Sequence, residues 1–393
     1  MSIVTTIEQA IRPLFLTSNI LGLGVYTPEK LYLSIFYNVT LWTTCSYFFY
    51  HVVIIFQLEY WYLVITTVIN NGINYLVTII SMVISLCQHK KLQMFIKRLA
   101  AVDDTLEDLG TPKIYQKLHV CIKRILIGWL VYSLIINISD IMWWFRTTNN
   151  FWCIIIPYVT NCFPHANLFV DLMFATYLWY IGTRFDKLNK HMRSLSLREE
   201  CNIRYTQRKA VWTTRRYIMC INNYKHIWWT TMHLYLELCK LARELNAMYE
   251  TQMTIEMLAC LIYLTRIFHF IFIRITDNLM LSLIEWINIY LWLSVYVIKL
   301  FCLNYICESI SAKSNEMKTI IQRLTNSLRY TDIRDEIYQF TLYIIHHPLK
   351  FSGLGLFYFG YSFLRNSVMA ILTFVIITMQ IPRTSEVFTY VGF

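Results

Sequence analysis

The last long apolar run, residues 354–381, constrains the fold of this chain most. It is long enough to cross a lipid bilayer, because a spanning helix needs about 20 residues. The run is not uniformly apolar. At about 100° per residue, four of its polar side chains share a stripe roughly 40° wide. These four are Ser362, Asn366, Thr373 and Gln380. A membrane helix turns such a stripe away from lipid, towards another helix or towards water.

Six further apolar runs predict an all-α, polytopic membrane protein with seven transmembrane helices. The 393 residues are 56% hydrophobic and only 15% charged, whereas about a quarter of a soluble domain is charged. We treat residues 1–393 as a single domain that is embedded in the lipid membrane. The predicted spans cover residues 31–56, 61–87, 125–145, 151–182, 254–275, 282–307 and 354–381.

Basic residues gather in alternate connections between these spans. Residues 88–124 hold eight Lys and Arg, residues 183–253 hold thirteen and residues 308–353 hold six, whereas the opposite connections hold only Arg146. The positive-inside rule therefore predicts a cytoplasmic N-terminus and an extracellular C-terminus. This is the reverse of a G-protein-coupled receptor, and the DRY and NPxxY motifs of that class are missing as well. The net charge of +11 is explained by this placement, so we expect no nucleic-acid partner.

The basic segments are predicted to be helical. Residues 183–200, 205–249 and 311–346 mix apolar and charged side chains at helical spacing. We expect spans four and five to continue into the cytosol, where the segments form a helical anchor bundle. Basic helices lying on anionic lipid are a compatible alternative. The fourth span contains Pro157 and Pro164, which predict kinks or a helix that continues past the membrane.

Patterns typical of enzymes or metal sites are missing. The sequence lacks GxSxG, HExxH and P-loop motifs, and its eleven cysteines form no CxxC pair. The adjacent His346 and His347 point about 100° apart on a helix, and no partner cluster accompanies them. We therefore expect no enzymatic activity, no cofactor and no metal; a membrane enzyme ranks last among the alternatives.

Polar and aromatic residues recur at one depth, in the outer half of four spans. Such a set predicts a pocket open to the exterior for a small organic ligand. The simpler explanation is an aromatic belt at the membrane interface, with Arg266 paired to Glu285 or Asp140. That explanation suits any single residue, whereas the set as a whole slightly favours a pocket. Lys299 and Arg365 are expected to snorkel or pair nearer the cytoplasm. The predicted pocket residues are Asp140, Trp143, Trp144, Tyr158, Asn161, His165, Arg266, His269, Glu285 and Trp286.

The polar stripe of the last span has two explanations that the sequence supports about equally. It packs against a neighbouring helix, or it lines a pore when repeated around a symmetric oligomer. In a pore, rings of Asn366, Thr373 and Gln380 would alternate with apolar rings at Met369 and Ile377.

The C-terminal region resembles the insect gustatory receptors. Phe351-Ser-Gly-Leu-Gly-Leu-Phe357 matches the family segment Phe-Ser/Thr-x-x-Gly-x-Phe. Thr373 and Gln380 have the spacing of the family motif Thr-Tyr, five mostly apolar residues, Gln-Phe. Phe374 and Ile381 replace the motif's Tyr and Phe. The related odorant receptors are the nearest alternative, and the Thr…Gln spacing favours the gustatory branch.

This resemblance implies a tetrameric, ligand-gated, non-selective cation channel in the plasma membrane of sensory neurons, opened by a small tastant. Homomers and heteromers with related receptors both occur among such channels. It further implies a gate at Gln380 and Ile381, a pore wall at Thr373 and Asn366 with Ile377 beside them, and a turn at Gly353 and Gly355 before the membrane helix. An aliphatic ring at residue 381 would gate by dewetting. A non-channel receptor or transporter remains the alternative function.

Overall fold

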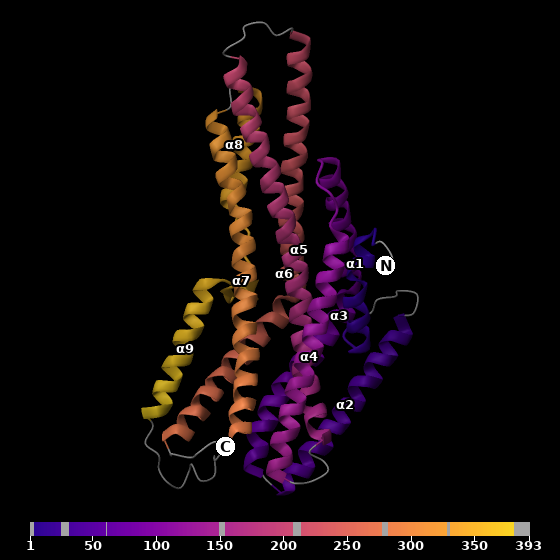
Figure 1. Ribbon diagram of the computed structural model, residues 1–393, viewed down its shortest axis with the longest axis vertical. Helices are drawn as coiled ribbons and strands as arrows, with labels where there is room; N and C mark the ends of the chain where they lie inside the picture. Colours follow the sequence, from indigo (N-terminus) through magenta and orange to yellow (C-terminus); the bar gives the residue numbers. More distant parts are fainter. Residues whose placement is uncertain are drawn as a thin grey trace.

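The computed structural model describes residues 4–24, 31–59, 61–148, 154–206, 214–276, 282–327 and 331–380. Within these ranges the chain is almost entirely helical, as the sequence predicts (Figure 1). The elements are α1 (Ile7–Ile20), α2 (Leu31–Glu59), α3 (Trp61–Asp108), α4 (Tyr115–Thr148), α5 (Ile155–Thr206), α6 (Thr214–Thr276), α7 (Leu283–Ser327), α8 (Thr331–His346), β1 (Ser352–Gly353), β2 (Phe357–Tyr358) and α9 (Tyr361–Gln380).

Several helices are far longer than a bilayer is thick. The predicted continuation of spans four and five is confirmed, since α5 continues to Thr206 and passes through Pro164, and α6 already begins at Thr214. In Figure 1 the extensions of α5, α6 and α7 rise together with α8 beside them. A helical bundle beyond the apolar region therefore exists, as the mixed charged and apolar spacing predicts.

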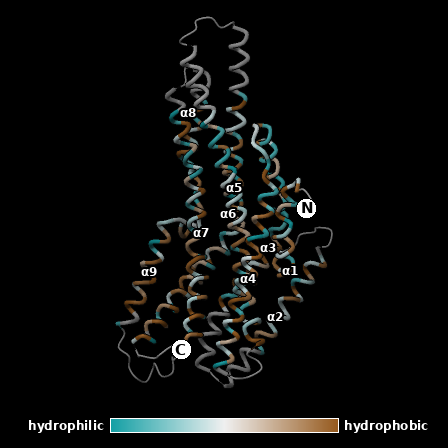
Figure 2. Tube along the Cα trace, viewed as in Figure 1, coloured by the Kyte–Doolittle hydropathy of each residue, from teal (hydrophilic) through white to brown (hydrophobic). Residues whose placement is uncertain are grey.

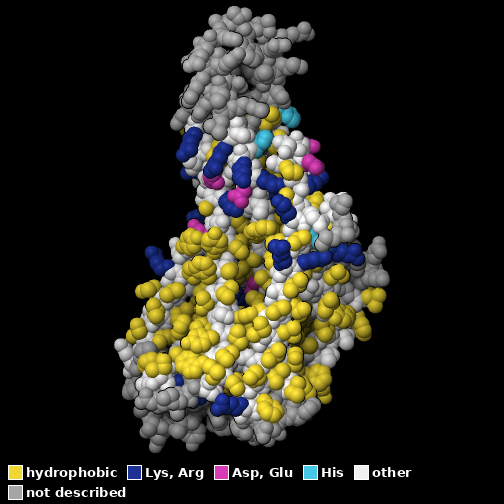
Figure 3. All heavy atoms as spheres, viewed as in Figure 1, with side chains coloured by type: hydrophobic (Ala, Val, Ile, Leu, Met, Phe, Trp, Pro, Cys, Tyr) yellow, Lys and Arg dark blue, Asp and Glu magenta, His cyan; other side chains and the backbone are white. Residues whose placement is uncertain are grey.

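Hydrophobic side chains cover the opposite part of the molecule. Figure 2 shows brown, apolar helices in the lower half, and Figure 3 shows a nearly continuous hydrophobic surface there with Lys and Arg gathered above it. An exposed apolar surface of this extent is typical of contact with lipid. Among the described residues, four helices are long and apolar enough to cross a membrane, judged by their length and composition. They are Gly72–Asp108, Tyr115–Arg146, His226–Thr276 and Leu283–Arg323, and a shorter apolar helix covers Tyr361–Ile377.

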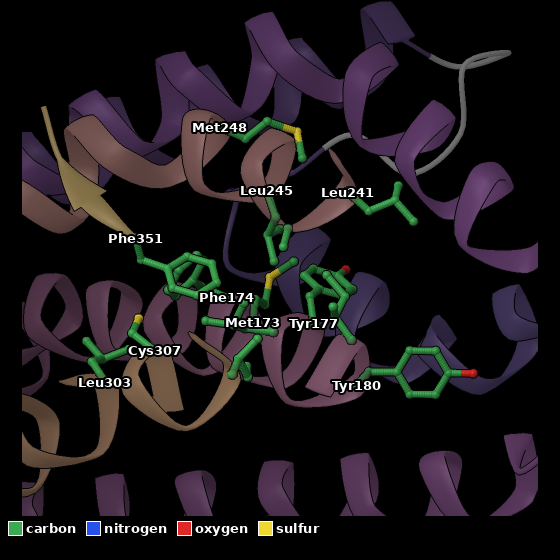
Figure 4. Close-up of a cluster of buried hydrophobic side chains, with 14 of the residues drawn as sticks. Met173, Phe174, Tyr177, Tyr180, Leu241, Leu245, Met248, Leu303, Cys307 and Phe351 are labelled. Atoms are coloured by element: carbon green, nitrogen blue, oxygen red, sulfur yellow. The ribbon is translucent and has the colours of Figure 1, made fainter. Parts of the chain in front are cut away.

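Helix α5 lies at the centre of the fold. It packs against α3, α4, α6 and α7, and its Phe169 and Phe174 side chains are no more than 1% exposed. Figure 4 shows Met173, Phe174 and Tyr177 of α5 in one cluster with residues of α6 and α7. Because lipid is as apolar as these side chains, close packing rather than the escape from water holds this part of the bundle together.

The last membrane helix begins later than predicted. Residues 354–360, which we assigned to the seventh span, form a turn instead, and α9 starts at Tyr361. β1 and β2 pair antiparallel, with Gly353 opposite Phe357, while Leu354 and Gly355 have φ angles of 49° and 71°. Two consecutive positive φ values end a right-handed helix. The predicted turn at Gly353 and Gly355 is thereby confirmed.

Candidate ligand site and pore helix

Asp140 on α4 is the centre of a buried polar cluster. The Nδ2 of Asn161 on α5 donates a hydrogen bond to its Oδ2 at 2.5 Å. The Nδ2 of Asn288 and the Nε1 of Trp292, both on α7, donate to its Oδ1 at 2.6 and 3.2 Å. Asp140 is only 8% exposed. One carboxylate thus joins three helices through three neutral donors.

The cluster extends along α4 and α5. Asn161 also donates to the Oδ1 of Asn137 at 3.1 Å, and the Nδ1 of His165 lies 3.3 Å from the Oγ of Ser133. Helical spacing of three or four residues places these side chains on one face of each helix. We call Ser133, Asn137, Asp140, Asn161, His165, Asn288 and Trp292 the Asp140 cluster. Its members satisfy one another, so a ligand that enters has to replace hydrogen bonds already present.

The structure brings three predicted pocket residues together in this cluster, namely Asp140, Asn161 and His165. Asn288 and Trp292 are functional candidates that the sequence reasoning missed, although both lie on the same face of α7. Their spacing of four residues, which puts two polar side chains on one face of an apolar helix, could have identified them.

The other predicted pocket residues are distributed over α4, α5, α6 and α7. Trp143 and Trp144 stack edge to face, with ring centroids 4.7 Å apart. Tyr158 is half exposed, at 50%. The side chain of Glu285 accepts a hydrogen bond from the backbone N–H of Ser282 at 2.7 Å, which caps the start of α7. The remaining three are Arg266 and His269, half-buried on α6, and Trp286, whose ring stacks on that of Tyr290.

A second buried set carries full charges. The Nζ of Lys299 on α7 lies 2.6 Å from the Oδ2 of Asp171 on α5 and also contacts Glu256 of α6. Gln252 donates its Nε2 to the Oε1 of Glu256 at 2.9 Å. We call Lys299, Asp171 and Glu256 the Lys299 triad. The sequence predicts that Lys299 either snorkels or pairs, and the structure shows that it pairs. Glu256 was missed by the sequence analysis, although it lies inside the predicted fifth span.

Helix α9 has two opposite faces. Ser367, Ile371 and Val375 are buried where the helix packs against α6 and α7. At about 100° per residue, the centre of the polar stripe of α9 lies about 160° around the helix from that face. All the stripe residues are exposed, namely Ser362, Asn366, Met369, Thr373, Ile377 and Gln380. Figure 1 shows α9 at the edge of the molecule. The predicted gate residue Ile381 lies outside the described residues.

Comparisons with solved structures identify the same architecture. The structure of the insect olfactory receptor OR5 from Machilis hrabei matches with a TM-score of 0.64 and 12% sequence identity, over 95% of this chain and 98% of that chain. The structure of that receptor in complex with eugenol matches with a TM-score of 0.58 and 14% identity, over 96% and 99%. At these identities the likeness shows the fold alone. It confirms the predicted class, an all-α polytopic membrane protein.

A sequence search of curated proteins gives no match. In contrast, a family model described as 7tm Chemosensory receptor matches residues 11–382, nearly the whole chain. The resemblance noted around residues 351–381 is therefore confirmed at the level of the family. This chain belongs to the 7tm chemosensory receptor family.

Proposed function

We propose that this chemosensory receptor is a gustatory receptor that acts as a ligand-gated, non-selective cation channel, with α9 of each subunit lining the pore. One observation carries the proposal: the polar stripe of α9 is exposed and points away from the helices that the structure describes. Packing within the subunit, which was the competing explanation of the stripe, uses the opposite face at Ser367, Ile371 and Val375.

An isolated subunit would leave the side-chain amides of Asn366 and Gln380 against lipid, where unsatisfied polar groups are costly. Four subunits around one axis remove that cost, because the stripes then face a water-filled centre. Ile377 would supply an apolar ring between the polar ones, and the gate would form at Gln380 and Ile381. The tetramer consists of identical or related subunits.

The charge distribution supports a cytoplasmic N-terminus, an extracellular C-terminus and residence in the plasma membrane of a sensory neuron. In that orientation the bundle formed by the extensions of α5, α6 and α7 is a cytoplasmic anchor, and the gate is at the outer end of α9.

A tastant acts at the Asp140 cluster in this proposal. The cluster lies between α4, α5 and α7, so a ligand that replaces its hydrogen bonds alters the contacts among three helices. That a receptor of the same fold was solved with eugenol supports a small organic ligand here. The spacing of Thr373 and Gln380 supports taste rather than smell as the modality.

Electrophysiology of cells that express this protein alone tests the proposal. Sugars, bitter alkaloids and other tastants are applied, and we expect at least one to evoke a cation current. Single-particle images of the purified protein should show fourfold particles. Monomers that bind a tastant without any current would instead support the alternative, a non-channel receptor or transporter.

A further inference from the structure

A cavity separate from the Asp140 cluster lies between α1, α3, α5 and α6. It encloses about 50 Å³, space for roughly four water-sized groups, since each needs about 10–15 Å³. His165, the member of the Asp140 cluster nearest to the cavity along α5, and Val170 of the cavity wall are roughly 7.5 Å apart along the helix axis at 1.5 Å per residue.

The wall combines apolar and polar residues. The apolar ones include Phe15, Leu23, Ile84, Leu92, Val170 and Met173. The polar ones are Ser18, Ser81, Ser85, Gln88, His89 and Gln252. A wall of this mixed composition fits a molecule that has a polar group and an apolar body.

The polar residues of the cavity wall present hydrogen-bond acceptors. The Oε1 of Gln88 is buried and has no hydrogen-bond partner in the described part of the chain. Ser81 donates its hydroxyl to the carbonyl of Val77 at 2.8 Å, which leaves its Oγ as an acceptor. The Nδ1 of His89 lies 2.8 Å from the carbonyl of Leu86, so this nitrogen is the donor of that hydrogen bond. The free acceptor at Gln88 favours an occupant that donates a hydrogen bond.

The end of α1 is shaped to close one side of this space. Leu23 N–H donates to the carbonyl of Ser18, and Gly22 N–H to that of Asn19, while Gly22 has a φ angle of +66°. This pair of bonds with a left-handed glycine is the Schellman ending of a helix. It turns the buried Leu23 into the cavity wall, and Trp42 Nε1 fixes the turn by donating to the carbonyl of Gly22 at 3.0 Å.

We propose that this cavity is a second ligand site, which binds the hydroxyl group of a small neutral amphiphile with its apolar body against α1 and α5. The hydroxyl donates to Gln88 Oε1. The site is coupled to the charged interior, because Gln252 lines the cavity and also holds Glu256 of the Lys299 triad. The same chemistry is available from a free alcohol or from a membrane sterol.

Photolabelling of the full-length protein in phosphatidylcholine nanodiscs tests the proposal, with a diazirine-bearing octanol as the probe and peptide mass spectrometry as the readout. We expect label on peptides that line the cavity. Octanol should compete, whereas methyl heptyl ether, which has the same number of heavy atoms but no O–H, should compete about tenfold less well.

Three variants sharpen the test, each checked for folding by its thermal unfolding. Ser85→Phe fills the cavity and should lower its labelling at least about tenfold. Gln88→Met keeps the shape but removes the acceptor, and should lower labelling by about threefold to tenfold. Gln322→Met, the same change on an exposed part of α7, should have no effect. If Ser85→Phe fails to fold, the labelling of Gln88→Met still tests whether the cavity binds the probe.

Cholesterol added to the nanodiscs identifies the source of the hydroxyl. Protection of the cavity by cholesterol means that the bilayer supplies the ligand; protection by octanol alone means that a free alcohol does. The proposal is overturned if cavity peptides are not labelled above the remainder of the chain, if Gln88→Met is labelled like the unmodified protein, or if the ether competes as well as octanol.

Discussion

The ammonium nitrogen of Lys299 on α7 lies 2.6 Å from a carboxylate oxygen of Asp171 on α5. With Glu256 of α6 in contact as well, one cation and two acids connect three helices inside an apolar bundle. A charge within a membrane protein is expensive unless it is paired, and such residues commonly have functional roles. This triad and the Asp140 cluster use the same helix, α5, at two depths.

Replacing Lys299 by Met should destabilise the protein strongly, because it leaves two buried carboxylates without their cation. Removing one member of a buried pair typically costs about 3–5 kcal/mol of unfolding free energy. Thermal unfolding of the purified protein measures this. Adding Glu256→Gln should recover part of the loss. Lys97→Met, which removes an exposed charge on α3, should change the stability by less than about 0.5 kcal/mol. Equal effects of Lys299→Met and Lys97→Met would contradict a structural role for the triad.

The Asp140 cluster should respond to loss of its acceptor. Asp140→Ala leaves the donors of Asn161, Asn288 and Trp292 buried without a partner, and we expect a loss of about 2–4 kcal/mol in unfolding free energy. Asp140→Asn keeps the shape and should cost less. Tyr32→Phe serves as the control, since Tyr32 on α2 is 87% exposed, belongs to no predicted site, and should be neutral in both stability and tastant response. If Asp140→Ala proves as stable as the control, the cluster is not the buried network described.

Gly360 lies directly before α9, where the chain packs against α7. Its φ angle is +147°, a backbone conformation that residues with a side chain rarely adopt. Its N–H also donates to the Oδ1 of Asn304 at 2.9 Å. Gly360→Ala should therefore lower the unfolding free energy by about 1–3 kcal/mol. Gly128→Ala is the matched control, because that helical glycine has open space around its Cα and alanine should be neutral or slightly stabilising. The assignment fails if both variants unfold at the same temperature.

Sequence periodicity predicted the helices well, because apolar run length and charge spacing are local properties. It placed the extensions of α5 and α6 correctly, whereas the turn at Gly353 and Gly355 came from the resemblance to the gustatory receptors. It misplaced the start of α9, since residues 354–360 are as apolar as a helix and only the positive φ angles of Leu354 and Gly355 reveal the turn.

The sites were harder to predict than the helices. Asp140, Asn161 and His165 could be selected by type and depth, but their partners on α7 depend on which helices meet. Glu256 and Lys299 are 43 residues apart in sequence, and no local pattern joins them. The cavity beside Gln88 was not anticipated either, because one wall comes from the end of α1, a short helix to which the sequence assigned no role.

The central claim is that the polar stripe of α9 lines a pore. Thr373→Cys and Leu372→Cys test it in cells that respond to a tastant, because both positions are exposed but point about 100° apart on the helix. A charged methanethiosulfonate reagent, applied during the evoked current, should irreversibly change the current through Thr373→Cys and leave that through Leu372→Cys unchanged. Equal modification of the two variants, or no effect on Thr373→Cys, would contradict the pore assignment.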